Sequence, residues 1–162
     1  MIFERAVKED MPRILEIYEG ARQFMKETGN PNQWRDTEPK ESELWEDIEL
    51  KRLFVVKEEG KIEAVFMFSM VPDPTYTTIY DGQWPNNGSY GTLHRVASAG
   101  NIPRIADKIF EWAAGFVPNL RIDTHEDNKV MQNAIKRNGF QYCGIIYLLN
   151  GEERLAYQKV LG

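Results

Sequence analysis

The sequence predicts an α+β (mixed α/β) fold, with a central mixed but mostly antiparallel sheet of about seven strands and helices on both of its faces. Three observations support this. Several short segments are rich in apolar and β-branched residues, others repeat apolar residues at three- and four-residue steps, and one strand–helix–strand unit requires parallel strands. In order, these segments give β-α-α-β-β-β-α-β-α-β-β. A length of 162 residues suits one hydrophobic core, so we expect a single domain over residues 1–162.

Composition excludes several classes of function. A net charge of −5 and a pI of about 5.2 disfavour nucleic acid and anionic membranes as partners, and suit a basic or amine substrate better. The single cysteine, Cys143, excludes an internal disulfide framework and a redox pair. The first ten residues lack the apolar core of a signal peptide, and the longest apolar run, 64–71, is too short to span a bilayer. We expect a cytoplasmic protein.

The first half of the chain predicts a strand, two helices and a hairpin. Asp10 is expected to cap the first helix, whose apolar residues from Met11 to Met25 form one buried face. The segment 62–71 would be apolar on both faces of a strand, so we expect it at the centre of the sheet. The predicted strands cover residues 2–7, 53–57 and 62–71, a breaker-rich loop covers 28–40, and the second helix contains Ser42, Leu44, Trp45 and Ile48.

The second half predicts two strand–helix units followed by a hairpin. Pro103 is expected at the start of the first of these helices, and Gly139 in the C-cap position of the second. The connection 72–88 is either a second hairpin tip or a mobile flap, and the sequence leaves both open. The strongest hairpin signal is Asn150-Gly151. The predicted strands cover residues 89–98, 120–124, 140–148 and 152–160, and the helices contain the apolar residues from Ile102 to Ala113 and the segment 128–138.

The segment 89–114 predicts an anion site, because a strand passes through a short turn into a helix. Such a junction directs backbone N–H groups and the positive end of a helix dipole at one point, where phosphate binds well. Cofactor sites in mixed sheets lie at the carboxyl ends of the parallel strands. Here those ends are residues 96–106 and 125–128. A phosphorylated cofactor is therefore expected.

Two sequence patterns accompany this order of elements. Residues 101–106, where strand becomes helix, read Asn-Ile-Pro-Arg-Ile-Ala, and Asn128 is followed by Met131, Ile135 and then Gly139-Phe140. On these residues and on the element order, the chain resembles the GCN5-related N-acetyltransferases (GNAT) over essentially its whole length. The first pattern corresponds to the family's Gln/Arg-x-x-Gly-x-Gly/Ala, which wraps the pyrophosphate of coenzyme A. The second corresponds to the family's Asn, small residue, Tyr and Gly-Phe.

The resemblance implies an acyltransferase, namely an N-acetyltransferase that moves an acetyl group from acetyl-CoA to a primary amine of a small molecule or peptide by direct attack. It also implies a homodimer, since family members are commonly dimers. The alternative, motivated by Arg104 and Ile135, is a non-catalytic acyl-CoA-binding or regulatory module on the same fold. The residues expected to bind the cofactor are Val96, Ala97, Ser98, Asn101, Ile102, Arg104, Ile105, Ala106, Asn128 and Met131.

Two residues depart from the family patterns. Arg104 replaces a glycine, so its side chain either blocks the cofactor or pairs with a phosphate through a charge-assisted contact. Ile135 replaces the tyrosine that in many members protonates the departing thiolate, and it has no proton to donate. Because general acid–base help is worth ~10²–10⁴-fold, its absence lowers the rate rather than forbidding the reaction. Asn128 keeps the pattern, but an asparagine there is equally a helix cap.

Three residues are candidates for the chemistry that the resemblance implies. The backbone N–H of Val96 would stabilise the developing oxyanion, and His94 and His125 are the only two histidines that could remove a proton from the amine. Alternatively, His94 has no role in the chemistry and is a packed, hydrogen-bonded residue of the strand. The nearby Asp123 supports a role for His125, either as the base or as a residue that orients the substrate. Two histidines without a tight ligand spacing are a weak metal signal, so no metal is expected.

The acceptor amine is expected to meet residues outside the cofactor segment. Trp34 and Gln33, in the loop between the first two helices, would line the acceptor pocket, as that loop does in family members, and Asp123 would face the substrate. The alternative is that Trp34 simply covers the core. Trp84, in the connection 72–88, has the same two interpretations, and Arg95 is either a cofactor-loop residue or a surface ion-pair residue.

Overall fold

The computed structural model, which describes residues 1–162, has the predicted order of elements. Its seven strands form one sheet in the order β1-β2-β3-β4-β5-β7-β6. The β4–β5 pair is parallel, while the pairs β1–β2, β2–β3, β5–β7 and β6–β7 are antiparallel, which confirms the mixed, mostly antiparallel sheet. The elements are β1 (Ile2–Arg5), α1 (Met11–Glu27), α2 (Glu41–Glu49), β2 (Leu53–Glu58), β3 (Lys61–Ser69), β4 (Gly91–Ser98), α3 (Ile105–Ala114), β5 (Asn119–Thr124), α4 (Lys129–Arg137), β6 (Gln141–Tyr147) and β7 (Glu153–Val160), with short 3₁₀ turns η1 (Lys8–Asp10) and η2 (Pro74–Tyr76).

Contacts divide the chain into two compact units. The first unit comprises Met1–Phe68 and His94–Ala106, and the second comprises Ser69–Leu93 and Asp107–Gly162. The boundary between them runs through β4 and through α3. The segment after β4 therefore belongs to the first unit, and the segment after β5 belongs to the second.

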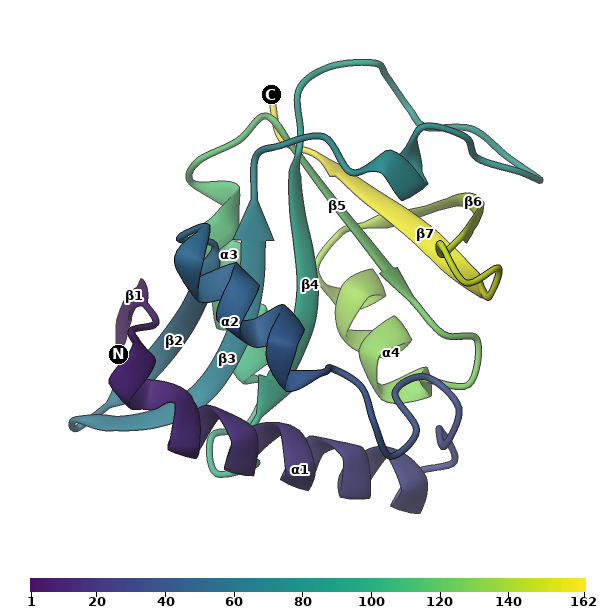
Figure 1. The fold of residues 1–162 in the computed structure, drawn as a ribbon. Helices are drawn as coiled ribbons and strands as arrows, with labels where there is room; N and C mark the ends of the chain where they lie inside the picture. Colours follow the sequence, from purple (N-terminus) through teal and green to yellow (C-terminus); the bar gives the residue numbers. More distant parts are fainter. The chain divides into compact units, whose positions relative to one another are not determined.

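The first unit buries apolar faces of α1 and α2 against the β2–β3 hairpin (Figure 1). Tyr18 of α1, Leu44 of α2 and Val65 of β3 are completely buried in this core. Their burial removes an apolar face of each element from water, and this is the main favourable contribution to the free energy of folding. β3 is buried along both faces from Ile62 to Ser69, so its predicted central position is confirmed.

α1 begins at Met11 after Asp10 as predicted, but the cap bond expected from Asp10 is absent, and the predicted start of α3 was wrong. The carboxylate of Asp10 accepts the backbone N–H of Val7 at 2.9 Å, so it closes the η1 turn and makes no cap bond to α1. α3 begins at Ile105, two residues after Pro103, because Arg104 has a φ of +56° that no right-handed helix can include. Pro103 therefore lies in the turn before the helix rather than in its first turn.

The connection 72–88 of the second unit is an ordered segment without a hairpin of its own. It contains the η2 turn, and the indole N–H of Trp84 donates to the carbonyl of Tyr76 at 2.9 Å. The hydroxyl of Tyr90 accepts the backbone N–H of Asp73 at 2.9 Å. Aromatic side chains thus hold this segment by satisfying its backbone groups, which hydrophobic periodicity could not predict.

α4 is capped at both ends, by Asn128 in one of its two predicted roles and by Asn138, one residue before the predicted Gly139. The Asn128 side chain accepts the Met131 backbone N–H at 3.0 Å, so Asn128 is the N-cap. Asn138 is the C-cap, and Gly139 follows it with a φ of +85°, donating its N–H to the Lys136 carbonyl at 3.1 Å. Glycine reaches this left-handed conformation without steric cost.

Candidate active site

The segment after β4 in the first unit is shaped by unusual backbone conformations. Arg95 interrupts the extended conformation of β4 with a φ of +53°, one residue before Val96. Gly100 and Arg104 also have positive φ, at +85° and +56°. Non-glycine residues seldom adopt this region unless the surrounding structure fixes them.

Arg95 is fixed at both its side chain and its backbone. Its guanidinium donates to Asp47 through Nε at 2.9 Å and Nη2 at 3.0 Å, and the Asp47 carboxylate is fully buried. Asp47 also accepts from Nε of Arg52 at 2.7 Å. The hydroxyl of Tyr18 donates to the Arg95 carbonyl at 2.7 Å. Arg95 is therefore an internal ion-pair residue, and these bonds hold the backbone that precedes Val96.

Side chains of the turn after β4 are used to hold the turn itself. The Ser98 hydroxyl accepts the backbone N–H of Gly100 at 2.9 Å. The amide of Asn101 donates to Oε2 of Glu63 at 2.9 Å, and Glu63 is buried in β3. Asn101, which opens the predicted phosphate pattern, thus ties the loop to the sheet.

Arg104 has a φ of +56°, a left-handed backbone conformation that glycine adopts without steric cost. A left-handed conformation costs a non-glycine residue roughly 1–2 kcal/mol. The side chain is exposed and makes no hydrogen bond or ion pair. α3 starts at the next residue, Ile105, and the first turn of any helix has N–H groups without intrahelical acceptors. The residues present fit a phosphate in backbone geometry and in charge.

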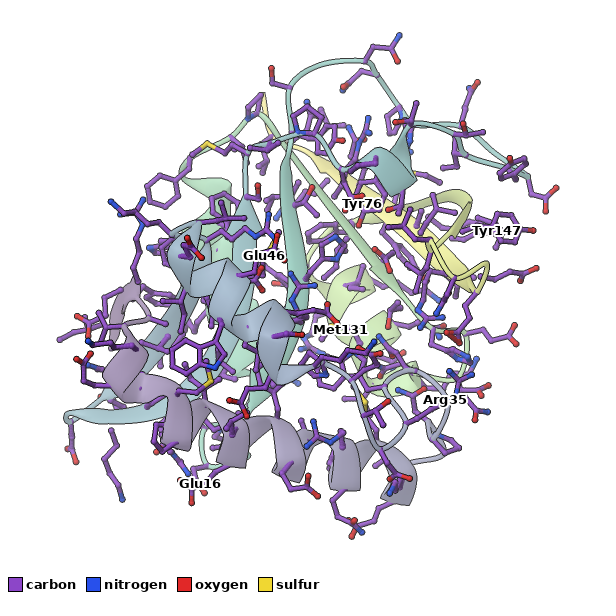
Figure 2. The ribbon with its side chains drawn as sticks, in the orientation of Figure 1. Glu16, Arg35, Glu46, Tyr76, Met131 and Tyr147 are labelled. Carbon is purple, nitrogen blue, oxygen red and sulfur yellow. The ribbon has the colours of Figure 1, made fainter.

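Tyr76 and Asp123 form a hydrogen-bonded pair in the second unit. The Tyr76 hydroxyl donates to Oδ2 of Asp123 at 2.6 Å, and its ring packs against Trp84 with centroids 5.3 Å apart. Burial, followed by the charge of Asp123, raises the pKa of Tyr76 well above 10. Tyr76 is 1% exposed, whereas Tyr147 reaches the surface (Figure 2). Tyr76 lies in the irregular connection 72–88, where no sequence signal indicated it.

Arg121 of β5 anchors the same connection. Its guanidinium carbon lies 3.9 Å from the ring centroid of Trp84 and 4.0 Å from that of Tyr90, between two aromatic faces. Nε donates to Gln158 at 2.8 Å, and burial lowers the pKa of Arg121 from its ordinary value. Such cation–π contacts stabilise a desolvated guanidinium. Trp84 therefore covers this arginine and Tyr76.

His125 directly follows β5 and has a defined hydrogen-bonding state. Its Nδ1 accepts the backbone N–H of Asp127 at 3.0 Å. An accepting nitrogen carries no proton, so the neutral ring bears its proton on Nε2. In this arrangement His125 offers a hydrogen-bond donor to a ligand, and acting as a base through Nε2 would require loss of the Asp127 contact.

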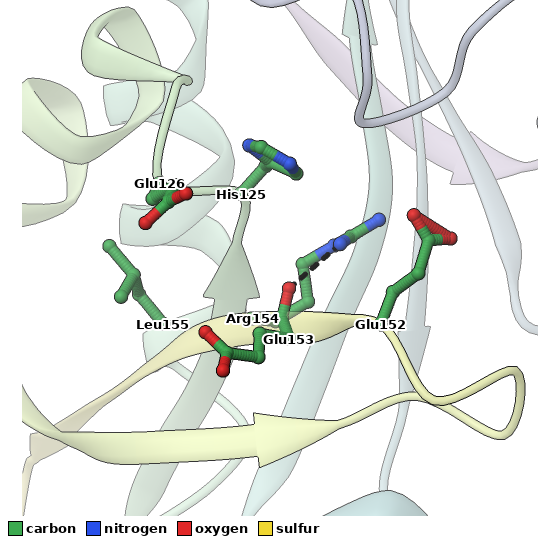
Figure 3. Close-up of a pocket in the computed structure, with 6 residues that line it drawn as sticks. All are labelled: His125, Glu126, Glu152, Glu153, Arg154 and Leu155. Carbon is green, nitrogen blue, oxygen red and sulfur yellow. Dashed lines mark hydrogen bonds between the residues drawn. The ribbon is translucent and has the colours of Figure 1, made fainter.

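A cavity of about 200 Å³ lies beside His125 in the second unit (Figure 3). Arg154 is 5% exposed and donates from Nη1 to the Glu153 carbonyl at 2.8 Å. In Figure 3, Arg154 and Glu152 extend toward the same side of the chain, and Glu153 points the other way, as alternation along a strand requires. The lining residues are His125, Glu126, Glu152, Glu153, Arg154 and Leu155. Sequence reasoning missed those after the β6–β7 turn, where the charged run 152–154 was the available signal.

The other predicted site residues occupy mixed environments. In the first unit, Trp34 packs edge-on against Tyr18 with centroids 5.6 Å apart, so it covers the core, and the Gln33 side chain accepts from Asn30 at 3.0 Å. His94 and Val96 are half-buried. In the second unit, Ile135 is completely buried. Of the remaining predicted cofactor residues, Ala97 and Ile105 are buried, and Ile102, Ala106 and Met131 are half-buried. No group of His, Cys, Asp or Glu side chains is arranged to hold a metal, and no helix has both the length and the apolar character of a membrane span.

Comparison with known structures finds acetyltransferases from several bacteria. A GNAT-family acetyltransferase from Streptococcus agalactiae is 28% identical, with a TM-score of 0.88, and the match covers 98% of this chain and 94% of that chain. One from Listeria monocytogenes is 21% identical, with a TM-score of 0.73 and coverage of 99% and 94%. A protein from Salmonella typhimurium, whose structure contains its cofactor acetyl-CoA, is 14% identical, with a TM-score of 0.65 and coverage of 99% and 94%. No protein-family model and no curated protein matches the sequence.

These likenesses, together with the fold, define the chain as an acyltransferase enzyme. Its fold is that of the GCN5-related N-acetyltransferases, and it is similar to acetyltransferases of that family, as the resemblance of its sequence implied. Acetyl transfer is its general reaction. The single domain, the homodimer and the cytoplasmic location stay predictions.

Proposed function

We propose that the chain transfers the acetyl group of acetyl-CoA to a primary amine of a small molecule or peptide. The observation that carries this proposal is the positive φ of Arg104, because it gives the phosphate loop a glycine-like backbone despite the substitution. Residues 96–106 would bind the cofactor, with Asn128 and Met131 from α4. The exposed guanidinium of Arg104 would pair with a phosphate of the cofactor.

The reaction requires four balanced changes. The amine nitrogen forms a bond to the thioester carbonyl carbon, the C–S bond breaks, the nitrogen loses a proton and the thiolate gains one. The N–H of Val96 would stabilise the oxyanion, and one such donor is worth roughly 3–4 kcal/mol. The fixed backbone of Arg95 supports this assignment, since a preorganised donor needs no rearrangement during the reaction.

Proton transfer involves His94, His125 and Asp123 in this proposal. His125 acts as a donor that orients the acceptor, which agrees with its Nδ1 contact to Asp127, and His94 is left as the base. Asp123 faces the substrate, held by the Tyr76 hydroxyl. Ile135 supplies no proton to the thiolate, so the thiolate takes its proton from water.

A titration of the chain with acetyl-CoA, followed by a thiol-release assay over a panel of primary amines, tests the function. We expect saturable binding and release of thiol with at least one amine. Absence of binding at millimolar acetyl-CoA would overturn the proposed cofactor. Binding without thiol release over the panel would overturn the proposed amine acceptor.

A further inference from the structure

The peptide bond between Arg95 and Val96 carries the proposed oxyanion donor on one side and a hydrogen-bond acceptor on the other. The N–H of this peptide belongs to Val96. Its carbonyl belongs to Arg95 and accepts the hydroxyl of Tyr18 at 2.7 Å, although the two residues are 77 positions apart in the sequence. Because a peptide group is planar and rigid, whatever orients the carbonyl also orients the N–H.

The contact with Tyr18 determines where the Val96 N–H points. The peptide is trans, so its C=O and N–H groups point in opposite directions. The carbonyl is directed at α1, which carries Tyr18, and the N–H is therefore directed away from α1. The register of β4 with β5 covers Gly91 and Thr92, so that strand pair does not use the Val96 N–H.

Arg95 turns this peptide out of the regular pattern of β4. Its φ of +53° departs from the extended conformation, and irregularities of this kind in a strand re-aim groups beside active sites. The buried carboxylate of Asp47 holds the Arg95 side chain, at 2.9 Å and 3.0 Å. Arg95 is thus held at its side chain by Asp47 and at its carbonyl by Tyr18. Of these two contacts, only the second acts directly on the peptide that carries the Val96 N–H.

Tyr18 is suited to be a permanent donor. It is completely buried, and burial raises the pKa of its hydroxyl above the ordinary 10.0, so the hydroxyl keeps its proton at neutral pH. Its ring is packed edge-on against Trp34, with centroids 5.6 Å apart. A hydrogen bond to a carbonyl also polarises the amide, and hydrogen bonds in a chain strengthen one another. The bond from Tyr18 therefore makes the Val96 N–H a better donor as well as a better oriented one.

We propose that Tyr18 is a positioning residue for acetyl transfer, whose hydroxyl orients and polarises the Arg95–Val96 peptide toward the oxyanion. The proposal rests on the proposed function, because it names the residue that prepares the proposed oxyanion donor. In this role Tyr18 contacts neither the substrate nor the cofactor, and it keeps its proton throughout the reaction. An interaction that strengthens as the oxyanion develops raises kcat rather than the affinity for acetyl-CoA.

A pair of substitutions on α1 tests this role. Tyr18→Phe removes the hydroxyl and keeps the ring. We expect kcat for thiol release to fall about tenfold, the value of one hydrogen bond, while the KM and calorimetric Kd for acetyl-CoA stay within about twofold. An unchanged kcat in Tyr18→Phe would overturn the proposal.

Ile14→Val is the matched control, because Ile14 is a completely buried residue one turn earlier on α1. The substitution removes a methyl group and lowers stability by a similar amount without touching the Arg95–Val96 peptide. Urea unfolding compares the stability of the two variants. We expect kcat of Ile14→Val to stay within about twofold of that of the unsubstituted chain. Equal falls in kcat for the two variants would assign the effect to packing and overturn the proposal.

The thioester carbonyl of bound acetyl-CoA reports on the same peptide without turnover. An isotopic label at the acetyl carbonyl carbon allows its stretching band to be identified by infrared difference spectroscopy. A hydrogen bond from the Val96 N–H polarises this carbonyl and lowers its stretching frequency. We therefore expect a higher frequency in Tyr18→Phe and no change in Ile14→Val, and the same frequency in Tyr18→Phe as in the unsubstituted chain would overturn the proposal.

The two measurements separate failure of this inference from failure of the proposed function. Unaltered acetyl transfer by Tyr18→Phe would reject the role of Tyr18 and keep the proposed function. The expected frequency shift in a chain that releases no thiol with any amine would keep the contact between Tyr18 and the donor peptide and reject the proposed acceptor. Absence of acetyl-CoA binding would overturn both.

Discussion

The segments that follow β4 and β5 differ in what carries their chemistry. After β4, three residues with positive φ, Arg95, Gly100 and Arg104, shape the backbone, and side chains such as Asn101 hold the loop in place. After β5, the backbone passes directly into a capped helix, and the side chain of His125 lines a charged cavity. The first segment presents backbone groups, and the second presents side chains.

This difference determines how each segment tolerates substitution. A site formed by backbone groups depends on the backbone conformation. Glycine reaches a positive φ most easily, but an arginine that the surrounding structure fixes can also adopt it. A side-chain site needs particular atoms, so Ile135 cannot replace a tyrosine that donates a proton. Departure from a sequence pattern is therefore less damaging after β4 than after β5.

The largest expected effect comes from Asp47, which holds the backbone before Val96 through Arg95. Asp47→Ala leaves Arg95 and Arg52 without their buried carboxylate, and we expect the free energy of unfolding to fall by about 3–5 kcal/mol. Urea unfolding measures this. Glu43→Gln is the control, because Glu43 lies 3.7 Å from Arg95 and is 40% exposed, so its loss should cost less than about 1 kcal/mol. Similar losses for both variants would contradict the anchoring role.

The stability of the chain at alkaline pH tests one buried tyrosine in each unit. Burial raises the pKa of Tyr18 and Tyr76 above the ordinary 10.0, so the folded chain keeps protons that the unfolded chain releases. Their contribution to stability is complete below about pH 10 and is lost as pH rises above it, with a slope of about 1.4 kcal/mol per pH unit for each tyrosine.

Urea unfolding from about pH 8 to about pH 11 measures this slope. Tyr18→Phe and Tyr76→Phe should each flatten it above about pH 10 relative to the unsubstituted chain. An unchanged slope in either buried variant would show that this tyrosine titrates alike in the folded and unfolded chains.

Two substitutions of Arg104, in the segment 96–106, test its backbone conformation and its charge separately. Arg104→Gly removes the left-handed strain and should raise the free energy of unfolding by about 1 kcal/mol. Arg104→Ala retains the strain and removes only the guanidinium. Both variants should bind acetyl-CoA about tenfold more weakly if the guanidinium pairs with a phosphate. Calorimetric titration checks this, and undiminished affinity in both variants would rule out the phosphate contact.

The smallest effect concerns Asn128, where capping and cofactor binding are competing roles. Asn128→Ala should lower the free energy of unfolding by about 1 kcal/mol through loss of the bond to Met131, while Asn128→Ser should retain most of the cap. If the cap is the only role, acetyl-CoA affinity stays unchanged in Asn128→Ser. A fall in affinity with stability retained would assign Asn128 to the cofactor site.

Sequence periodicity predicted the fold well because most elements bury one regular face. β3 is central as its two apolar faces predicted, and the hairpin at Gly151 and the capping of α4 follow from local turn and cap chemistry. The start of α3 was misplaced, since the conformation of Arg104 delays this helix, and the Asp10 carboxylate bonds to Val7 instead of to the first turn of α1. Local propensity alone does not choose between such nearby alternatives.

The candidate site was only partly predictable. Asn128 and His125 stand at the ends of regular elements, so spacing along the chain indicated them. Tyr76 comes from an irregular connection and bonds to Asp123. Arg154 comes from the start of β7 and lines the same cavity as His125 because the sheet pairs β5 with β7.

The sequence by itself determined the order of elements, the family resemblance and the absence of a tyrosine at residue 135, since these depend on residue types and their spacing. Only the tertiary structure decided that Arg104 adopts a glycine-like φ, that Asp47 holds Arg95, and that a buried arginine faces glutamates around one cavity. The physical reason is that a strained φ and a buried charge persist only where contacts from distant segments stabilise them. Those contacts exist only after the chain has folded.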